Sequence, residues 1–246
     1  ALQPRLARVF NAAGIPVMEG YGLTETSPVV SVNCEGDKGL MIGTVGRVID
    51  DVEVKIADDG EILVKGPNVM QGYYKKPDKT SEVLKDGWFH TGDIGEIVGD
   101  RFLKITDRKK EIFKTSGGKY IAPQVMENKF KESRFIEQIM VIGEGQKHAA
   151  ALIVPAFEFL EEWCNRKGIE FGSTEKIIAN DRVVARIQKE VDHFNEGFGK
   201  WETIKKFELI GQVWGIDTGE LTPTLKLKRK AILSKYEDLH KKIYEL

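Results

Sequence analysis

The sequence predicts an α+β protein in which a β-rich part precedes a smaller part that mixes helices with strands. In residues 52–66 the segment VEVKI alternates apolar and charged side chains, ADDG supplies turn residues and EILVKG returns, which together are typical of an antiparallel hairpin. The segment DRVVARIQKEVDHFNEG at 181–197 spaces its apolar residues as an amphipathic helix does. The 246 residues, 41% of them hydrophobic, are enough to bury one large core or two smaller ones.

Strands and turns are expected over residues 1–106. The apolar segment IPVM at 15–18 predicts a strand that precedes the polar sequence EGYGLTETS. WFHTGD, IGEIV and RFLKITD continue the alternation of strands and turns, and HTGDIG predicts a tight turn at Asp93. One helix is expected in PDKTSEVLK, opening at Pro77 in the first-turn position that proline favours.

Residues 107–246 are predicted to form the small α+β domain. PQVMENKFKES indicates a helix, IEQIMVIG and ALIVP indicate strands, and a closing helix begins around Arg229 or Lys230. The entrance to this domain, TDRKKEIFKTSGGKY, is polar and charged and ends in a double glycine. This composition suits an exposed hinge that leads into a flexible loop, so we place the boundary between 106 and 107.

Charge and cysteine usage exclude several classes of protein. The balance of 37 basic and 38 acidic residues, a net charge of -1, argues against a nucleic-acid partner. Cys34 and Cys164 lie far apart and outside any CxxC or Cys/His spacing, so neither disulfides nor zinc are predicted and a reducing cytoplasm is expected. The longest apolar run, AAALIVPAF, is much shorter than the roughly 20 residues of a membrane-spanning helix and predicts a buried strand.

Two segments in the first part have the composition of ligand-binding loops. EGYGLTETS offers glycines for close backbone approach, the ring of Tyr21 to cover a planar group, and the carboxylate of Glu25 to hold Mg²⁺ beside phosphate oxygens. The alternative is an ordinary turn. Asp93 could accept hydrogen bonds from a ribose diol, or it could cap its own turn.

Two segments in the second part are candidates for a functional role. KTSGGKY lacks the spacing of a phosphate-binding Walker loop, so we expect either a mobile glycine loop that lines a channel or a plain β-turn. In ELTPTLKLKRK the sequence Thr-Pro-Thr forms a stiff turn, which places Lys226 on a loop. The charges at 228–230 are misplaced beside a helix N-terminus, so helix stability does not explain them, although a solvated face still could.

Taken in order, GYGLTETS, WFHTGD, TDRKKEIFKTSGGKYIAP and LTPTLKLKRK resemble the successive signatures of the adenylate-forming superfamily along the whole chain. SGGKYIAP and TPTLKLKR are most similar to the forms found in long-chain fatty-acid CoA ligases. The resemblance implies that a fatty acid attacks the α-phosphate of MgATP to give acyl-adenylate, and that the thiol of CoA then displaces AMP. It also implies a distorted barrel-like sheet within 1–106, the end of a large adenylating domain, and a mobile C-terminal lid at 107–246.

The same resemblance assigns roles to individual residues. Tyr21 packs on adenine, Gly22 and Thr24 approach the phosphates, Glu25 holds Mg²⁺, and Asp93 and Arg108 bind the ribose. The hinge is Asp107 or Lys110. In the second part, Gly117 and Gly118 line the pantetheine channel, Lys114 serves the second step, and Lys226 is the mobile catalytic lysine. A cation between the attacking carboxylate and the α-phosphate offsets their repulsion and stabilises the developing charge.

Two departures from the family pattern matter. Leu225 stands where the family commonly has glycine, so the choice of Lys226 over Lys228 rests on aligning the preceding Thr-Pro. Nothing in the chain resembles the family's phosphate loop, TSGTTGxPKG, or its large acyl-binding subdomains. We therefore expect a C-terminal portion of a longer enzyme, lacking an N-terminal region of the same chain and unable to form acyl-adenylate alone.

Two other functions remain open at this stage. A related ligase would act on a medium-chain, aromatic or luciferin-like acid, or would replace CoA with a carrier protein. A module without chemistry would use KLKRK to meet acidic partners or a membrane surface, and peripheral membrane contact is also compatible with the full-length ligase.

Overall fold

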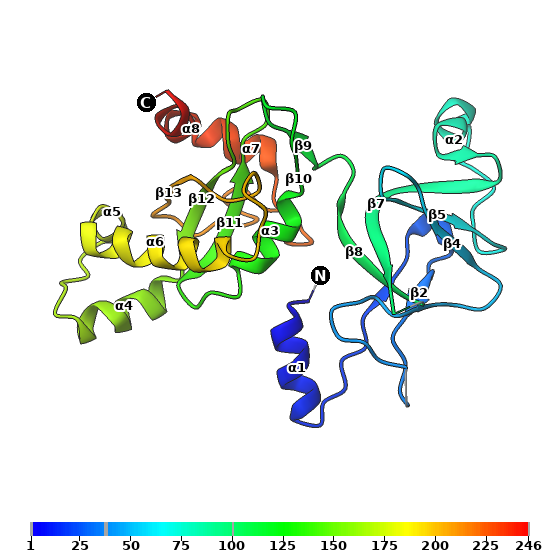
Figure 1. The fold of residues 1–246 in the computed structure, drawn as a ribbon, viewed down its shortest axis with the longest axis horizontal. Helices are drawn as coiled ribbons and strands as arrows, with labels where there is room; N and C mark the ends of the chain where they lie inside the picture. The colour runs from blue at the N-terminus through cyan, green and yellow to red at the C-terminus, as the bar shows by residue number, and fades with distance from the viewer. Residues whose placement is uncertain (1, 37–38, 100, 246) are drawn as a thin grey trace. The chain divides into compact units, whose positions relative to one another are not determined.

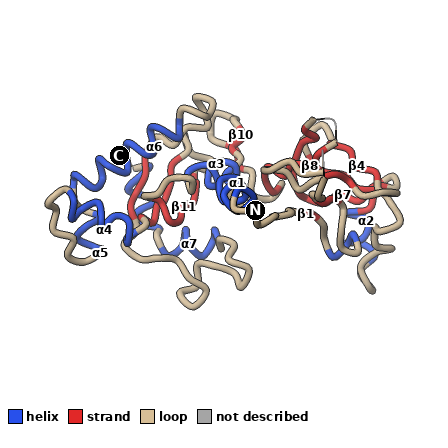
Figure 2. The backbone as a smooth tube through the Cα atoms, turned by 90° about the horizontal axis from the view of Figure 1, so that it is seen from below, coloured by secondary structure: helices blue, strands red, loops and turns tan. Residues whose placement is uncertain are grey.

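The computed structural model describes residues 2–36, 39–99 and 101–245. The chain divides into two compact units, Ala1–Glu111 and Ile112–Leu246, a few residues after the boundary expected from the sequence (Figure 1). Both units combine strands with helices, which confirms the α+β class. Most strands belong to the first unit and most helices to the second (Figure 2).

An antiparallel sheet of eight strands forms the framework of the first unit. The strands run in the order β1-β2-β3-β8-β7-β5-β4, and β6 pairs with β7. Their bounds are β1 Gly20–Tyr21, β2 Ser31–Val32, β3 Arg47–Val48, β4 Glu53–Ile56, β5 Glu61–Lys65, β6 Leu84–Lys85, β7 Trp88–Val98 and β8 Phe102–Arg108. Among the described residues no ladder joins β4 back to β1, so the barrel-like sheet that we expected is open rather than closed.

The predicted hairpin and the predicted helix of this unit are both confirmed. Strands β4 and β5 pair with Val54 opposite Val64, and α2 spans Pro77–Val83. Ile62, Val64, Phe89 and Leu103 form the buried core together with Val30. Because these side chains come from β5, β7 and β8, the central strands of the sheet are fixed by apolar packing.

Three local expectations for this unit were wrong. Residues 15–18 lie outside any strand, and β1 begins only at Gly20. A helix not expected from the sequence, α1, spans Pro4–Ala12; Leu6, Val9 and Phe10 have helical spacing, but only Ala7 of its residues is buried. Asp93 lies inside strand β7, opposite Arg108, instead of in a turn: Gly92 takes a φ of +71°, yet the pairing with β8 includes Asp93.

The second unit is built on a three-stranded sheet. Strands β11, Ile136–Ile142, and β12, Ala150–Pro155, are antiparallel, and β13, Lys206–Leu209, pairs with β12 in parallel. A separate short hairpin joins β9, Phe113–Lys114, to β10, Tyr120–Ile121. The helices are α3 Pro123–Phe130, α4 Phe157–Arg166, α5 Thr174–Ile178, α6 Asp181–Asn195, α7 Arg229–Lys235 and α8 Glu237–Tyr244.

Both faces of the three-stranded sheet are buried. Alternate residues of β12, such as Ala151 and Ile153, pack with α3, α4, α5 and α6, while Leu152 and Val154 pack with α7 and α8. Side chains that alternate between two covered faces explain why the β12 sequence is continuously apolar. The closing helix begins at Arg229, as predicted, but it is divided into α7 and α8 at Tyr236.

Candidate functional site

The segment GYGLTETS folds into a rigid loop at the end of β1. A Cβ atom at Gly22 would lie 1.6 Å from the carbonyl oxygen of Pro28, so only glycine fits there. The hydroxyl of buried Thr26 accepts a hydrogen bond from the backbone N–H of Leu23 at 2.9 Å and donates to the carbonyl of Pro28 at 3.1 Å. These bonds fix a short 3₁₀ turn, Thr24–Thr26, in which Thr24 is exposed.

Tyr21, Asp93 and Arg108 lie together, although Tyr21 and Asp93 are 72 positions apart. The hydroxyl of Tyr21 donates to Oδ2 of Asp93 at 2.7 Å, and Nε of Arg108 lies 3.4 Å from Oδ1. Asp93 is 6% exposed. Burial, followed by the charge of Asp93, raises the pKa of Tyr21 far above its ordinary value, so the phenol stays protonated and acts as the donor.

A buried carboxylate, Glu61, holds the strand segment that carries Asp93. Its oxygens accept hydrogen bonds from the backbone N–H of Gly92 at 2.9 Å and from Nζ of Lys109 at 2.8 Å, and Nδ1 of His90 lies 3.0 Å away. Burial alone would raise the pKa of Glu61, but the bonds from Lys109, His90 and Gly92 outweigh it and hold the pKa below its usual range. The carboxylate is therefore ionised at neutral pH.

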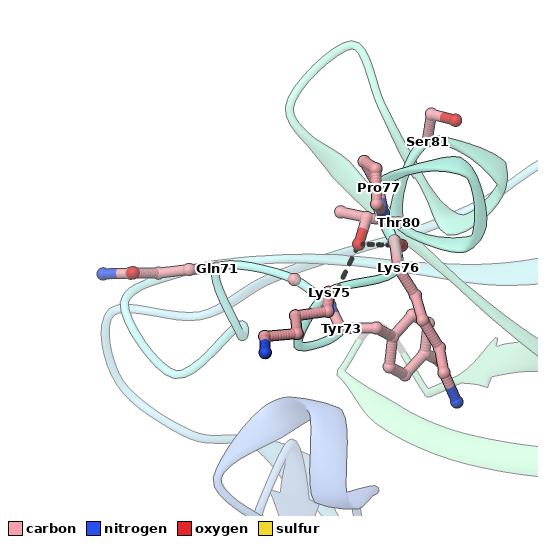
Figure 3. A pocket seen from close by; sticks show the side chains of 8 residues that line it. Gln71, Tyr73, Lys75, Lys76, Pro77, Thr80 and Ser81 are labelled. Carbon is pink, nitrogen blue, oxygen red and sulfur yellow. Dashed lines mark hydrogen bonds between the residues drawn. The ribbon is translucent and has the colours of Figure 1, made fainter.

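Glu25 is oriented by a tyrosine from another part of the first unit. The hydroxyl of Tyr73 donates to Oε1 of Glu25 at 2.9 Å, and burial together with this carboxylate raises the pKa of Tyr73. The hydroxyl of Thr80, on α2, accepts from the backbone N–H of Tyr73 at 2.9 Å and donates to the carbonyl of Lys76 (Figure 3). Tyr73, Lys76 and Thr80 help to line an open pocket of about 500 Å³.

The TSGGKY segment forms the turn between β9 and β10. Thr115 and Lys119 close it with a backbone bond of 2.9 Å, and Gly118 takes a φ of +75°. Gly117 and Gly118 are both exposed. The ammonium group of Lys114 lies 4.7 Å from the ring centre of Tyr120, directly across the hairpin.

Lys226 lies on an exposed turn, as the sequence predicts. The backbone N–H of Thr222 donates to the carbonyl of Lys226 at 2.8 Å, and the N–H of Lys226 donates to the Thr222 hydroxyl at 3.0 Å. Leu225 has a φ of +58° and is 69% exposed. The residue that replaces the family's usual glycine therefore adopts the left-handed conformation that glycine accepts most easily.

The two hinge candidates differ in their surroundings. Asp107 is fully buried at the end of β8, and its Oδ1 accepts the backbone N–H of Arg108 at 2.6 Å. Lys110 is exposed in the turn after β8, which is closed by the bond from the N–H of Glu111 to the carbonyl of Arg108. Only Lys110 thus lies outside the sheet.

The structure brings three of the predicted residues together in the first unit. Tyr21, Asp93 and Arg108 form one contact group, whereas Glu25 contacts Tyr73, a residue that the sequence reading missed. Among the described residues no group of three or more His, Cys, Asp or Glu side chains could hold a metal ion. In the part of the chain that the structure describes, no helix is long and apolar enough to cross a membrane.

Two family models match parts of this chain. The family model described as AMP-binding enzyme matches residues 1–74, and the model of the AMP-binding enzyme C-terminal domain matches residues 110–246. The chain therefore belongs to the AMP-binding enzyme family.

Among curated proteins, this chain is similar to long-chain-fatty-acid–CoA ligases. The long-chain-fatty-acid–CoA ligase FadD15 of Mycobacterium bovis is 40% identical over 244 residues, which are 99% of this chain and 40% of the relative. Human long-chain-fatty-acid–CoA ligase 1 is 39% identical over 251 residues, covering 94% of this chain and 36% of the relative. The chain thus spans about 40% of the length of the relatives it matches.

Solved structures share the fold. The adenylation domain of a Mycobacterium chelonae carboxylate reductase superposes with a TM-score of 0.75 at 23% identity, covering 98% of this chain and 37% of that one. The anthranilate CoA ligase AuaEII, solved with anthranoyl-AMP, gives a TM-score of 0.71 at 20% identity, covering 96% and 43%. At these identities the likeness concerns the fold.

Proposed function

We propose that the chain is the C-terminal portion of an ATP-dependent long-chain fatty-acid CoA ligase, which converts acid, ATP and CoA to acyl-CoA, AMP and pyrophosphate. The observation that carries this proposal is the buried carboxylate of Asp93, held between the Tyr21 hydroxyl and Arg108. It gains weight from family membership and from two relatives near 40% identity that are both named long-chain-fatty-acid–CoA ligases.

The first unit binds the nucleotide in this proposal. Asp93 accepts the ribose hydroxyls and Arg108 contributes a donor beside it, while the tethered hydroxyl of Tyr21 fixes the ring that covers adenine. The exposed backbone at Gly22 and the hydroxyl of Thr24 face the phosphates. Hydrogen bonds to a carboxylate are stronger than those to a neutral acceptor, which suits Asp93 to hold a diol.

Glu25 fits a magnesium ion that is shared with the nucleotide. Tyr73 uses Oε1 of this carboxylate, so Oε2 is the oxygen that we assign to the ion. Mg²⁺ typically takes one or two carboxylates and completes its shell with phosphates and water, which suits a described region without a larger acidic cluster. When bound, the ion supplies charge neutralisation at the phosphates.

The second unit serves both half-reactions. Lys226, exposed in its turn, stabilises charge on the α-phosphate during adenylation. Gly117 and Gly118 line the channel for the pantetheine of CoA, and Lys114 assists thioester formation. A rotation about Lys110, the exposed hinge candidate, exchanges these two sets of groups at the nucleotide.

Separate assays of the two half-reactions in the full-length enzyme test this proposal. Lys226→Ala should abolish fatty-acid-dependent ATP–pyrophosphate exchange and leave the reaction of preformed acyl-adenylate with CoA within a few-fold of wild type. Lys228→Ala is the matched variant and should retain exchange. Equal loss in both half-reactions, or loss only with Lys228→Ala, would contradict the role of Lys226.

The 246-residue chain alone should be unable to form acyl-adenylate, because its sequence holds no phosphate loop. Fatty-acid-dependent ATP–pyrophosphate exchange by the purified chain would show that this part of the proposal is wrong. Thioester assays of the full-length enzyme on acids of graded length, with CoA or a carrier protein as the thiol, distinguish a long-chain ligase from its medium-chain, aromatic and carrier-dependent relatives.

A further inference from the structure

The turn that carries Lys226 has few contacts of its own. Its internal hydrogen bonds join Thr222 to Leu225 and Lys226, and the side chains of Leu225 and Lys226 are exposed. An isolated bridge pairs Leu221 with Leu227 at its base. The position of the Lys226 ammonium group therefore depends on the contacts that fix the two ends of this segment.

A buried carboxylate, Glu220, holds the first end. It is 1% exposed, and Nζ of Lys235, on α7, lies 2.5 Å from Oε1. The hydroxyl of Thr218 and the backbone N–H of Gly215 donate to Oε2. The backbone carbonyl of Glu220 accepts the N–H of Lys228 at 2.7 Å, so this residue ties the segment before the turn to the segment after it.

A second buried carboxylate, Glu127, holds the other end. Arg229 is the first residue of α7, and its Nη2 lies 2.6 Å from Oε1 of Glu127, on α3. Its Nη1 donates to the carbonyl of Val141, on β11, while the N–H of Val141 donates to Glu127 at 2.8 Å. One guanidinium group thus fixes the end of the turn to a helix and a strand of the core.

We propose that the ion pairs Glu220–Lys235 and Glu127–Arg229 are positioning contacts that set where the Lys226 ammonium group stands. The inference rests on the proposed function, because it gives these pairs a purpose only if Lys226 is catalytic. Replacing a buried ion pair by well-packed apolar residues is often neutral or stabilising, so stability alone is a weak reason for two such pairs to bracket a single turn. Directional bonds at both ends fix the orientation of the turn, which an apolar contact would not do.

Matched variants at Lys235 provide the sharpest test, because this side chain is 40% exposed and its replacement leaves no hole in the core. In the full-length enzyme, Lys235→Met keeps most of the length but loses the charge, and Lys235→Arg keeps the charge on a longer side chain. We expect Lys235→Met to lower kcat of ATP–pyrophosphate exchange at least tenfold with KM for ATP within twofold, and Lys235→Arg to stay within threefold of wild type. Lys230→Met, at an exposed neighbour, is the control and should stay at wild-type activity.

The reaction of preformed acyl-adenylate with CoA separates positioning from a general structural role. It should change less than threefold in Lys235→Met, whereas a damaged fold would lower both half-reactions. Equal loss in both, or undiminished exchange in Lys235→Met, would overturn the inference. Arg229→Lys provides the second measurement at the other end of the turn: it keeps the charge but not the two-pronged contact, and we expect the same selective loss of exchange.

The two proposals can fail separately. If Lys226→Ala leaves exchange intact, the catalytic assignment and the inference that depends on it both fail. If Lys226→Ala abolishes exchange and Lys235→Met does not reduce it, only the positioning inference fails.

Discussion

The Tyr73 hydroxyl donates to Oε1 of Glu25 across 2.9 Å, so a residue just before α2 orients the carboxylate that we assign to Mg²⁺. A hydrogen bond to a charged group contributes about 1.5 to 3 kcal/mol, and its loss should leave the carboxylate free to rotate. Removal of this hydrogen bond should therefore weaken Mg²⁺ binding at the proposed site.

Tyr73→Phe in the full-length enzyme should raise the Mg²⁺ concentration for half-maximal exchange and lower kcat by about tenfold, the equivalent of about 1.4 kcal/mol. Titration of exchange activity with Mg²⁺ measures both effects. Tyr74→Phe is the control, since Tyr74 is 84% exposed, and it should behave as wild type. An unchanged Mg²⁺ dependence in Tyr73→Phe would refute the orienting role.

Glu61→Gln should destabilise the chain at neutral pH by about 2 kcal/mol, because Lys109 and the backbone N–H of Gly92 lose the buried carboxylate that accepts their hydrogen bonds. The pKa of Glu61 is lowered in the folded state, so its contribution to stability is present above the unfolded pKa and is lost as pH falls through the folded pKa. Denaturant unfolding at several pH values should therefore show a difference that shrinks in acid.

Asp59→Asn is the matched control for that experiment. Asp59 also contacts Lys109, at 2.6 Å, but its side chain is 52% exposed. An exposed ion pair contributes about 0 to 1 kcal/mol, so the free energy of unfolding should barely change. Equal effects of the Asp59 and Glu61 substitutions would mean that burial does not decide the strength of this cluster.

Leu225→Gly should raise the free energy of unfolding, or leave it unchanged, even though glycine usually destabilises. The left-handed conformation costs a non-glycine residue about 1 to 2 kcal/mol, whereas the greater freedom of glycine in the unfolded chain costs about 0.5 to 1 kcal/mol. Leu225→Ala keeps the Cβ atom and should show no gain. Denaturant unfolding of the three proteins checks the order.

Glu127→Gln should remove a pH dependence of stability. Burial raises the pKa of Glu127 to about 7, against the opposing effect of Arg229. A raised pKa contributes stability that is fully present below the unfolded pKa and is lost as pH rises through the folded one, here between about 4.5 and about 7. The free energy of unfolding of wild type should fall relative to Glu127→Gln across this window, by up to about 3 kcal/mol. A difference in the free energy of unfolding between wild type and Glu127→Gln that stays constant over this pH range would contradict the prediction.

Local patterns in the sequence predicted much of the fold. The β4–β5 hairpin, the start of α2 at Pro77 and the buried strand β12 follow from alternation, proline position and a continuous apolar run. Helix α1 was not predicted, although Leu6, Val9 and Phe10 follow Pro4 at helical spacing. The segment HTGDIG predicts a turn at Asp93 because glycine favours turns, but strand β7 continues through Gly92 to Val98 and pairs with the next strand, β8.

The candidate site depended more on resemblance than on pattern. Tyr21, Asp93 and Arg108 were assigned from family signatures, and their contact arises only when β1, β7 and β8 take their places in the sheet. Tyr73 and Glu61 carried no recognisable motif, since these side-chain partners lie 29 or more positions away. The one local hint was an acidic residue, Glu61, directly before the apolar residues 62–64 of its strand.

Strand β8 ends at Arg108, only three residues before the first unit ends at Glu111. Anyone who wishes to graft the second unit of one relative onto the first unit of another should therefore join the sequences after Glu111. A junction placed before Asp107 would import a foreign strand end, and with it a foreign partner for Asp93.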